Sequence, residues 1–128
     1  MYLPLLRGKQ YELIALRELI QEDLLSQKIV PIIEPVKLSS TLIKTLSTFV
    51  EFNKEIAIII NPEVGDFINE LHDDNNGKLS DDFFDICKNN NVKFLVYLES
   101  DYNYEDFLEK YNYKEIGVIF KNTDSITI

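Results

Sequence analysis

The sequence predicts an α/β fold in which parallel βα units follow one another along the chain. Short runs rich in Ile, Val, Leu and Phe recur without alternating apolar and polar residues, which is typical of parallel strands buried on both faces. The intervals between these runs carry apolar residues at helical spacing. With 128 residues, 45% of them apolar, the chain has the size and composition of a single domain, expected to cover residues 1–128.

Five apolar runs are the predicted strands, and helices are predicted between them. The strands are expected at Tyr2–Leu6, Ile29–Ile33, Ile56–Ile60, Phe94–Leu98 and Ile116–Phe120. The helices are expected around Leu13, Leu16 and Ile20; Leu42, Ile43, Leu46, Phe49 and Val50; Val64, Phe67, Ile68 and Leu71; Phe83, Phe84 and Cys87; and Tyr104, Phe107, Leu108 and Tyr111. Ser39 or Ser40 is expected to cap the second helix, and Ser80 the fourth.

A faint internal repeat sharpens the fold class. Leu3–Arg7 aligns with Val30–Glu34 at an interval of 27 residues, and Ile58–Asn61 falls in the same frame. A repeat of that length is the unit of a TIM-type (β/α) barrel, whose eight units need about 250 residues, so this chain has room for about five. The prediction is therefore half of a TIM-type barrel, either alone or as the first half of a larger one. Its first and fifth strands would leave open edges that invite pairing with another chain.

Charge and composition exclude several classes of function. The formal charge of -9 disfavours direct binding to nucleic acid or to an anionic membrane. The longest apolar runs, such as Ala57–Ile60, are much shorter than a membrane span, and the first residues do not form a signal peptide. The single cysteine, Cys87, excludes an internal disulfide and a cysteine-based zinc site, and suggests a cytoplasmic protein. No cofactor or metal is expected.

Polar residues follow every predicted strand, at the carboxyl ends where parallel α/β folds carry their sites. Basic residues there can clamp a phosphate or carboxylate, and acidic ones can hold Mg²⁺ or transfer protons. Because polar residues are also expected wherever a strand exits into water, both explanations stay open. The candidate ligand-binding residues are Arg7, Lys9, Glu34, Lys37, Asn61, Glu99 and Lys121. No catalytic residue is assigned, and His72 is expected to be an exposed loop residue.

Acidic residues are concentrated after the first third of the chain. Residues 1–44 carry six basic and five acidic side chains, whereas residues 45–128 carry seven and seventeen. Such runs are commonly solvated helix faces; the alternative is an electronegative surface that imitates a nucleic-acid backbone and docks on a basic groove. The candidate partner-binding residues are Glu63, Asp66, Glu70, Asp73, Asp74, Asp81, Asp82 and Asp85.

Three segments of the amino-terminal half carry a family resemblance: Tyr2–Leu19, Ile29–Lys37 and Ile60–Gly65. They resemble the beta protein family of phage and bacterial proteins. The matching positions are Tyr2, Pro4, Arg7, Lys9, Glu12, Ala15, Leu16, Pro31 and Glu34. The resemblance implies a TIM-type barrel of roughly twice this length and a setting around mobile elements and defence loci. It implies no particular activity.

Two hypotheses of function follow. The first is a protein-binding module in phage–host conflict, in defence or anti-defence, which docks through a strand edge or the acidic surface. Its partner would be a second copy of the chain or a nucleic-acid-binding defence protein. The alternative is a half-barrel enzyme or ligand-binding domain for a phosphorylated or nucleotide-like small molecule at the strand carboxyl ends. The sequence favours protein binding, because an open half-barrel holds its loops less rigidly than catalysis demands.

Overall fold

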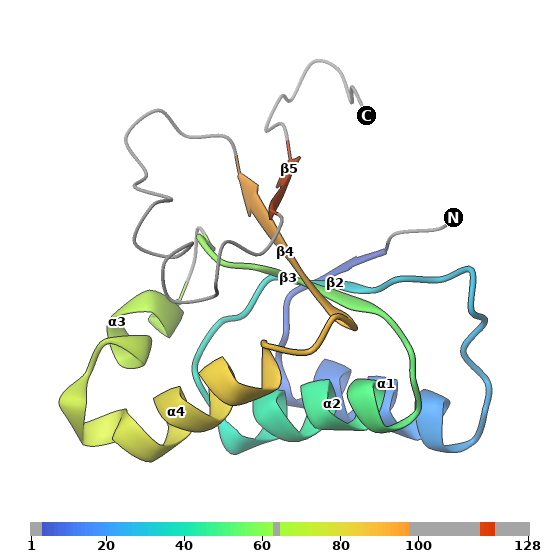
Figure 1. The fold of residues 1–128 in the computed structure, drawn as a ribbon, viewed down its shortest axis with the longest axis horizontal. Helices are drawn as coiled ribbons and strands as arrows, with labels where there is room; N and C mark the ends of the chain where they lie inside the picture. The colour runs from blue at the N-terminus through green and yellow to red at the C-terminus, as the bar shows by residue number, and fades with distance from the viewer. Residues whose placement is uncertain (1–3, 63–64, 98–115, 120–128) are drawn as a thin grey trace.

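The protein is a parallel α/β domain, as the sequence predicts (Figure 1). The structure, a computed structural model, describes residues 4–62, 65–97 and 116–119. Five parallel strands lie in the order β1-β2-β3-β4-β5, which is their order along the chain. Their bounds are β1 Leu5–Leu6, β2 Ile32–Ile33, β3 Ile56–Ile59, β4 Val92–Tyr97 and β5 Ile116–Ile119. Sequential parallel strands joined by helices are the arrangement of a barrel cut part-way round.

The strand register agrees with the internal repeat for the first two units only. Leu5 lies opposite Ile32, an offset of 27 residues, whereas Ile32 lies opposite Ala57, an offset of 25. The frame expected for the third strand is therefore displaced by two residues in the sheet. Pro4 and Pro31 precede β1 and β2, where their carbonyls accept from the N–H groups of Ile32 and Ala57. A proline at a strand start contributes its carbonyl to the ladder while its missing N–H costs no bond.

The helices that the structure describes cover one face of the sheet (Figure 1). They are α1 Gln10–Gln21, α2 Ser40–Glu51, α3 Phe67–Leu71 and α4 Gly77–Ile86, with a 3₁₀ turn, η1, at Asp74–Asn76. The apolar stripes of α1 and α2 point at the sheet, as their spacing predicts. Ser39 caps α2, because its hydroxyl accepts from the Leu42 N–H at 3.2 Å.

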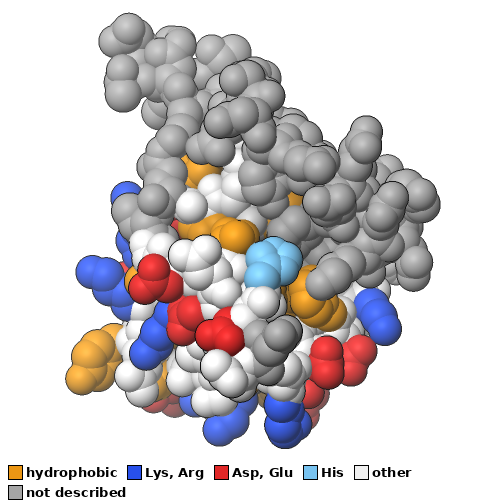
Figure 2. All heavy atoms as spheres, turned by 90° about the vertical axis from the view of Figure 1, so that its left-hand side faces the viewer, with side chains coloured by type: hydrophobic (Ala, Val, Ile, Leu, Met, Phe, Trp, Pro, Cys, Tyr) orange, Lys and Arg blue, Asp and Glu red, His pale blue; other side chains and the backbone are white. Residues whose placement is uncertain are grey.

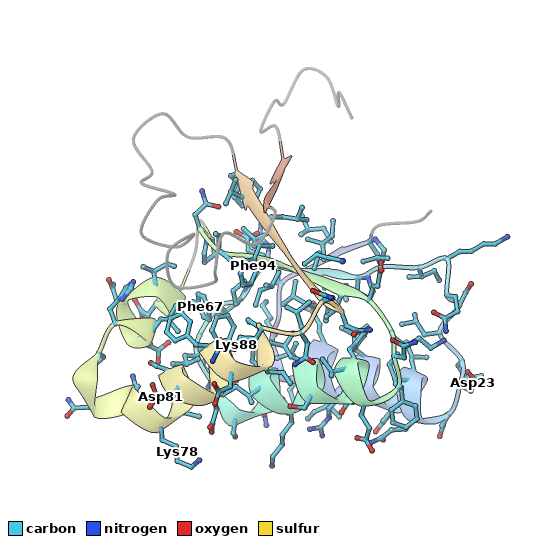
Figure 3. The ribbon with its side chains drawn as sticks, in the orientation of Figure 1. Asp23, Phe67, Lys78, Asp81, Lys88 and Phe94 are labelled. Atoms are coloured by element: carbon cyan, nitrogen blue, oxygen red, sulfur yellow. The ribbon has the colours of Figure 1, made fainter. Side chains whose placement is uncertain are left out.

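Large side chains fill the layer between helices and sheet. Phe49, Phe67, Phe83 and Phe94 are fully buried there, and Phe67 and Phe94 point toward this layer from α3 and β4 (Figure 3). The rings of Phe67 and Phe83 meet edge to face with centroids 5.3 Å apart, a favourable geometry for aromatic quadrupoles. This ring contact joins α3 to α4 within the core layer.

The opposite face of the sheet, here called the inner face because it corresponds to the interior side of a barrel, has its own apolar cluster. That cluster contains Val30, Ile32, Ala57, Ile59 and Tyr97. Residues of β3 alternate between the two faces, yet all four are buried. The unbroken apolar runs in the sequence are explained by this two-sided burial.

The prediction that Ser80 caps the fourth helix is wrong. Helix α4 begins three residues earlier, at Gly77, and Ser80 lies buried within its first turn. Its hydroxyl donates to the Leu71 carbonyl at 2.8 Å, which ties α4 to the end of α3. A serine can satisfy a neighbouring helix end as readily as its own, so its cap preference misplaced the boundary. Cys87 is buried as expected, and the helix predicted around Tyr104–Tyr111 lies outside the described residues.

Candidate functional site

The candidate site is a row of polar side chains at the carboxyl ends of four strands. Arg7, Glu34 and Asn61 follow β1, β2 and β3, and Tyr97 is the last residue of β4. Arg7, Glu34 and Asn61 each stand two residues beyond Leu5, Ile32 or Ile59, so strand alternation puts them on the inner face with Tyr97. This is the end at which parallel α/β folds collect their functional groups.

Glu34 is the centre of this row. Its side chain has 0% exposure, and its Oε1 accepts from the Arg7 guanidinium at 3.1 Å and from the Tyr97 hydroxyl at 2.9 Å. A buried carboxylate is costly unless charge and hydrogen bonds compensate it. Arg7 and Tyr97 supply both, from residues 27 and 63 positions away in the sequence. Half of the Arg7 side chain remains exposed.

The Tyr97 phenol is held in its neutral, donating form. Burial, followed by the hydrogen bond and the negative charge of Glu34, raises the pKa of Tyr97 to about 12, and Arg7 opposes this in part. Ionisation would place a second negative charge against Glu34 in a buried position. At neutral pH Tyr97 is therefore a hydrogen-bond donor and not a base.

The Asn61 side chain continues the β3–β4 hydrogen-bond ladder by one pair of bonds. Its Nδ2 donates to the Tyr97 carbonyl at 3.0 Å, and its Oδ1 accepts from the Tyr97 N–H at 2.8 Å. The buried amide thus reproduces both halves of a backbone pair where β3 ends. Asn61 positions the strand that carries Tyr97, and both hydrogen bonds described for its amide are to the Tyr97 backbone.

A tight turn after β1 sets Arg7 beside Glu34. Gly8 has φ +61, and a Cβ there would stand 2.9 Å from Cγ2 of Ile33 and 3.1 Å from the Glu34 carbonyl oxygen. The Arg7 N–H donates to Oε2 of Glu12 at 3.0 Å, which closes the turn onto the first turn of α1. Glycine is required here by both the left-handed φ and the close approach.

A groove of about 450 Å³ lies between the first two βα units, where α1 and α2 begin. One wall is the start of α1 with Lys9, and the other is the start of α2 with Lys37. The lining residues are Gly8, Lys9, Gln10, Leu13, Val36, Lys37, Ser39, Ser40 and Thr41. Two helix amino termini and two exposed ammonium groups therefore border one hollow, which makes it electropositive.

The loop that carries Lys37 is fixed by α3 and by the residues directly before it. The Val36 carbonyl accepts from the Asp66 N–H at 3.0 Å, and the Leu38 N–H donates to Oε1 of Glu70 at 3.2 Å. Gly65 has φ +82 and packs so closely on Val36 that a Cβ would collide with its carbonyl. The second wall of the groove is thus held by the third βα unit.

The structure brings together five of the seven predicted ligand-binding residues. Arg7 and Glu34 form an ion pair, Asn61 supports the neighbouring strand, and Lys9 and Lys37 border the groove. Glu99 and Lys121 lie outside the described residues. Sequence reasoning missed Tyr97, which was assigned to an apolar core strand. The available signal was a tyrosine near the end of the predicted strand Phe94–Leu98, since its hydroxyl can reach the polar row.

The predicted acidic surface is interrupted by basic residues and by local bonds. Lys78 pairs with Asp82 at 3.1 Å and Lys88 with Asp85 at 3.3 Å, while Glu70 is used by the Leu38 loop. Figure 2 shows this end of the molecule, where red and blue side chains are interspersed around His72. A hollow of about 670 Å³ there is bordered by His72, Asp73, Asp81 and Asp85. Glu63 and the side chain of Asp74 lie outside the described part, and Asp66 is the residue directly before α3.

Neither a metal site nor a membrane-spanning helix is found among the residues that the structure describes. No group of three or more His, Cys, Asp or Glu side chains in the described ranges is placed to hold a metal ion. Among the helices described, none has the length and apolar character to cross a membrane. No protein-family model, curated protein or solved structure matches the chain. The resemblance to the beta protein family therefore stays a prediction.

Proposed function

We propose that this protein binds a small anion, a phosphorylated or carboxylate-bearing molecule, in the groove between α1 and α2. The observation that carries the proposal is that α1 and α2, each of 12 residues, both begin at this groove. Lys9 and Lys37 also border the groove. The free N–H groups and the dipole of a helix amino terminus favour anions. The two helix amino termini and the two ammonium groups all attract an anion to the groove.

The polar row adjoins this groove along the chain but does not line it. Arg7 directly precedes Gly8, which lines the groove, and the Arg7 guanidinium is bonded to Glu34 on the inner face. Its exposed half offers N–H groups to a phosphate or carboxylate oxygen. The chemistry assigned here is binding, with no reaction.

The test is titration of purified protein with inorganic phosphate and AMP, followed by amide chemical shifts. Shifts are expected at the starts of α1 and α2, Gly8–Gln10 and Ser39–Thr41. The double variant Lys9→Ala/Lys37→Ala should weaken binding about 100-fold or more, because each of the two lost charge-assisted bonds is worth about 1.5–3 kcal/mol.

A matched control removes the same charge elsewhere. Lys28 and Lys44 are exposed and do not border the groove, so Lys28→Ala/Lys44→Ala should bind as the wild type does. If both double variants weakened binding equally, the loss would be explained by net charge alone and not by the groove. Unperturbed helix starts at millimolar phosphate would refute the anion site.

A second function, protein docking through a strand edge, is favoured by a separate observation. Four of the five exposed large apolar side chains among the described residues lie in Leu5–Leu24, on the first βα unit. Its setting would be the cytoplasm and phage–host conflict, as the single cysteine and the family resemblance suggest. The edge is preferred to the acidic surface, because several acids of that surface are already paired.

Capture from lysates of phage-infected cells separates the two docking modes. Leu19→Lys should abolish capture of a partner that uses the edge, whereas Asp81→Lys should not. If Asp81→Lys abolished capture and Leu19→Lys did not, the acidic surface would be the docking surface. Capture that neither variant alters would remove both surfaces from consideration.

A further inference from the structure

Helix α1 carries a partly buried arginine, Arg17, whose inner nitrogen is unpaired. Of the buried side-chain nitrogen and oxygen atoms in the residues that the structure describes, only Nε of Arg17 has no hydrogen-bond partner. A buried donor without an acceptor is costly, and the cost is larger when the donor belongs to a charged group. Because buried polar atoms of native folds are almost always hydrogen-bonded, the acceptor for this Nε comes from outside the described part of the chain.

Helix α1 itself offers Arg17 no carboxylate. The neighbours of a residue on a helix surface stand three and four positions away. For Arg17 these are Leu13, Ile14, Ile20 and Gln21, of which none is acidic. The ion pairs within the described residues do not include Arg17 either. Its positive charge is therefore available to an anion that the described chain does not supply.

Arg17 lies on the side of α1 that faces α2, one turn beyond the lining of the groove. Gln10 and Leu13 line the groove from α1, and Arg17 follows them by seven and four positions, the spacing of one helix face. At this level α2 is in contact, because the Thr45 hydroxyl donates to the Leu13 carbonyl at 3.4 Å. Long helical side chains lean toward the preceding turn, so the Arg17 guanidinium is directed toward the groove.

The groove has room for more than one anionic group, and no acidic side chain lines it. Its volume of about 450 Å³ lies within the range of small-molecule sites, about 300–1,000 Å³. The chain holds 22 acidic residues against 13 basic ones, yet the groove is lined by two lysines and no acid. At 1.5 Å per residue, the Cα atoms of Gln10 and Arg17 stand about 10 Å apart along α1. A short molecule with an anionic group at each end spans the distance from the helix start to the leaning guanidinium.

We propose that Arg17 binds a second anionic group of the ligand, so that the groove takes a small molecule with two anionic groups on a short skeleton. The first group, a phosphate, lies at the helix starts with Lys9 and Lys37. The second, a phosphate or a carboxylate, meets the Arg17 guanidinium further along the contact of α1 with α2. A planar guanidinium matches either group in two parallel hydrogen bonds. This inference rests on the anion site proposed above and names the class of its ligand.

Pairs of ligands that differ by one anionic group test the inference by calorimetric titration of the purified full chain. 3-Phosphoglycerate and glycerol 3-phosphate share a skeleton and differ by a carboxylate; fructose 1,6-bisphosphate and fructose 6-phosphate differ by a phosphate at a longer spacing. In at least one pair, the wild type should bind the doubly anionic member about tenfold more tightly, as one charge-assisted bond implies. Arg17→Gln should remove that preference and leave the affinity for the singly anionic member unchanged. Arg17→Lys, which keeps the charge, should retain part of the preference.

Two controls separate the role of Arg17 from net charge and from stability. Lys28→Gln removes the same charge at an exposed position that does not line the groove, and should leave the ratio of the two affinities unchanged. Glutamine is nearly as good a helix former as arginine, so Arg17→Gln should unfold in urea as the wild type does. Equal affinities within both ligand pairs, or a ratio that Arg17→Gln leaves unchanged, would overturn the inference, while phosphate binding alone would uphold the anion site. Absence of phosphate binding would refute the anion site and the inference together.

Discussion

The polar row at the strand ends and the acidic helices α3–α4 both carry paired charges, but the paired residues differ in how far apart they lie along the chain. Glu34 bonds to Arg7 and Tyr97, which arrive from two other strands. Asp82 and Asp85 bond to lysines within four residues on α4 or just after it. The first group is buried and ties the sheet together, whereas the second is exposed. The sequence separation of the bonded residues, more than the number of charges, therefore marks the polar row and not α3–α4 as the group expected to govern stability and function.

Removal of the Glu34 carboxylate should have the largest effect on stability. Glu34→Ala removes this acceptor from the buried Tyr97 hydroxyl and the ion-pair partner from the half-exposed Arg7, and loss of the acceptor of a buried donor costs about 1–3 kcal/mol. The free energy of unfolding, measured in urea, should fall by this order. Glu34→Gln, which keeps the shape and one acceptor, should lose less. A loss from Glu34→Ala no larger than that from Asp82→Ala would contradict the distinction between the two groups.

Alkaline titration should reveal the bond between Tyr97 and Glu34. The pKa of Tyr97 is about 12 in the folded protein, against about 10 in an unfolded chain. Because the folded value is raised, the stabilisation is fully present below pH 10 and is lost as the pH rises from 10 to 12. The difference in unfolding free energy between wild type and Tyr97→Phe should therefore shrink by on the order of 2 kcal/mol over this interval.

Comparison with the phenylalanine variant isolates Tyr97 from the other tyrosines and from the lysines, which titrate alike in both proteins. A difference that stays constant from pH 9 to pH 12 would mean that the hydroxyl is not held by the carboxylate. Phosphate binding should change little in Tyr97→Phe at pH 7, since Arg7 keeps its ion pair.

The turn at Gly8 should be the next most sensitive point. Gly8→Ala places a methyl group in a left-handed conformation against Ile33 and should cost about 1–2 kcal/mol. Gly77 offers a matched control, because a Cβ there meets nothing within 4 Å and the residue begins α4. Gly77→Ala should be neutral or stabilising by up to about 1 kcal/mol. Equal losses at both positions would remove the special role of the Gly8 turn.

Hydrophobic pattern predicted most of the fold because burial is repeated along each element. The non-alternating runs at Ile32–Ile33 and Ile56–Ile59 are strands buried on both faces, and the stripe Leu13, Leu16 and Ile20 packs on the sheet. Boundaries were less predictable. β4 begins at Val92, two residues before its expected start, because the exposed Lys93 hides the beginning of the apolar run. The boundary of α4 was misplaced because the Ser80 hydroxyl bonds to the end of α3.

The site was predictable in location but not in its bonds. Position after a strand was sufficient to mark Arg7, Glu34 and Asn61, since parallel strands end together. The role of Tyr97 depends on the register between β3 and β4, which pairs Ile59 with Leu95, and no local pattern encodes that register. For the same reason the sequence offered Glu34 as a ligand-binding group, whereas the structure uses its Oε1 to hold Arg7 and Tyr97.

The exposed pairs of α4 should give the smallest effect. Lys78 is 89% and Asp82 42% exposed, so solvent screens their attraction and two flexible side chains lose entropy on pairing. An exposed pair four residues apart on a helix is worth about 0.3–0.5 kcal/mol, and less at high salt. Lys78→Ala should therefore change the free energy of unfolding by less than about 0.5 kcal/mol, with no difference left in 1 M NaCl. The deficit of Glu34→Ala should persist at that salt concentration, because Glu34 is buried away from the ions. A salt-sensitive Glu34 deficit, or a salt-resistant Lys78 deficit, would show that burial does not separate the two groups.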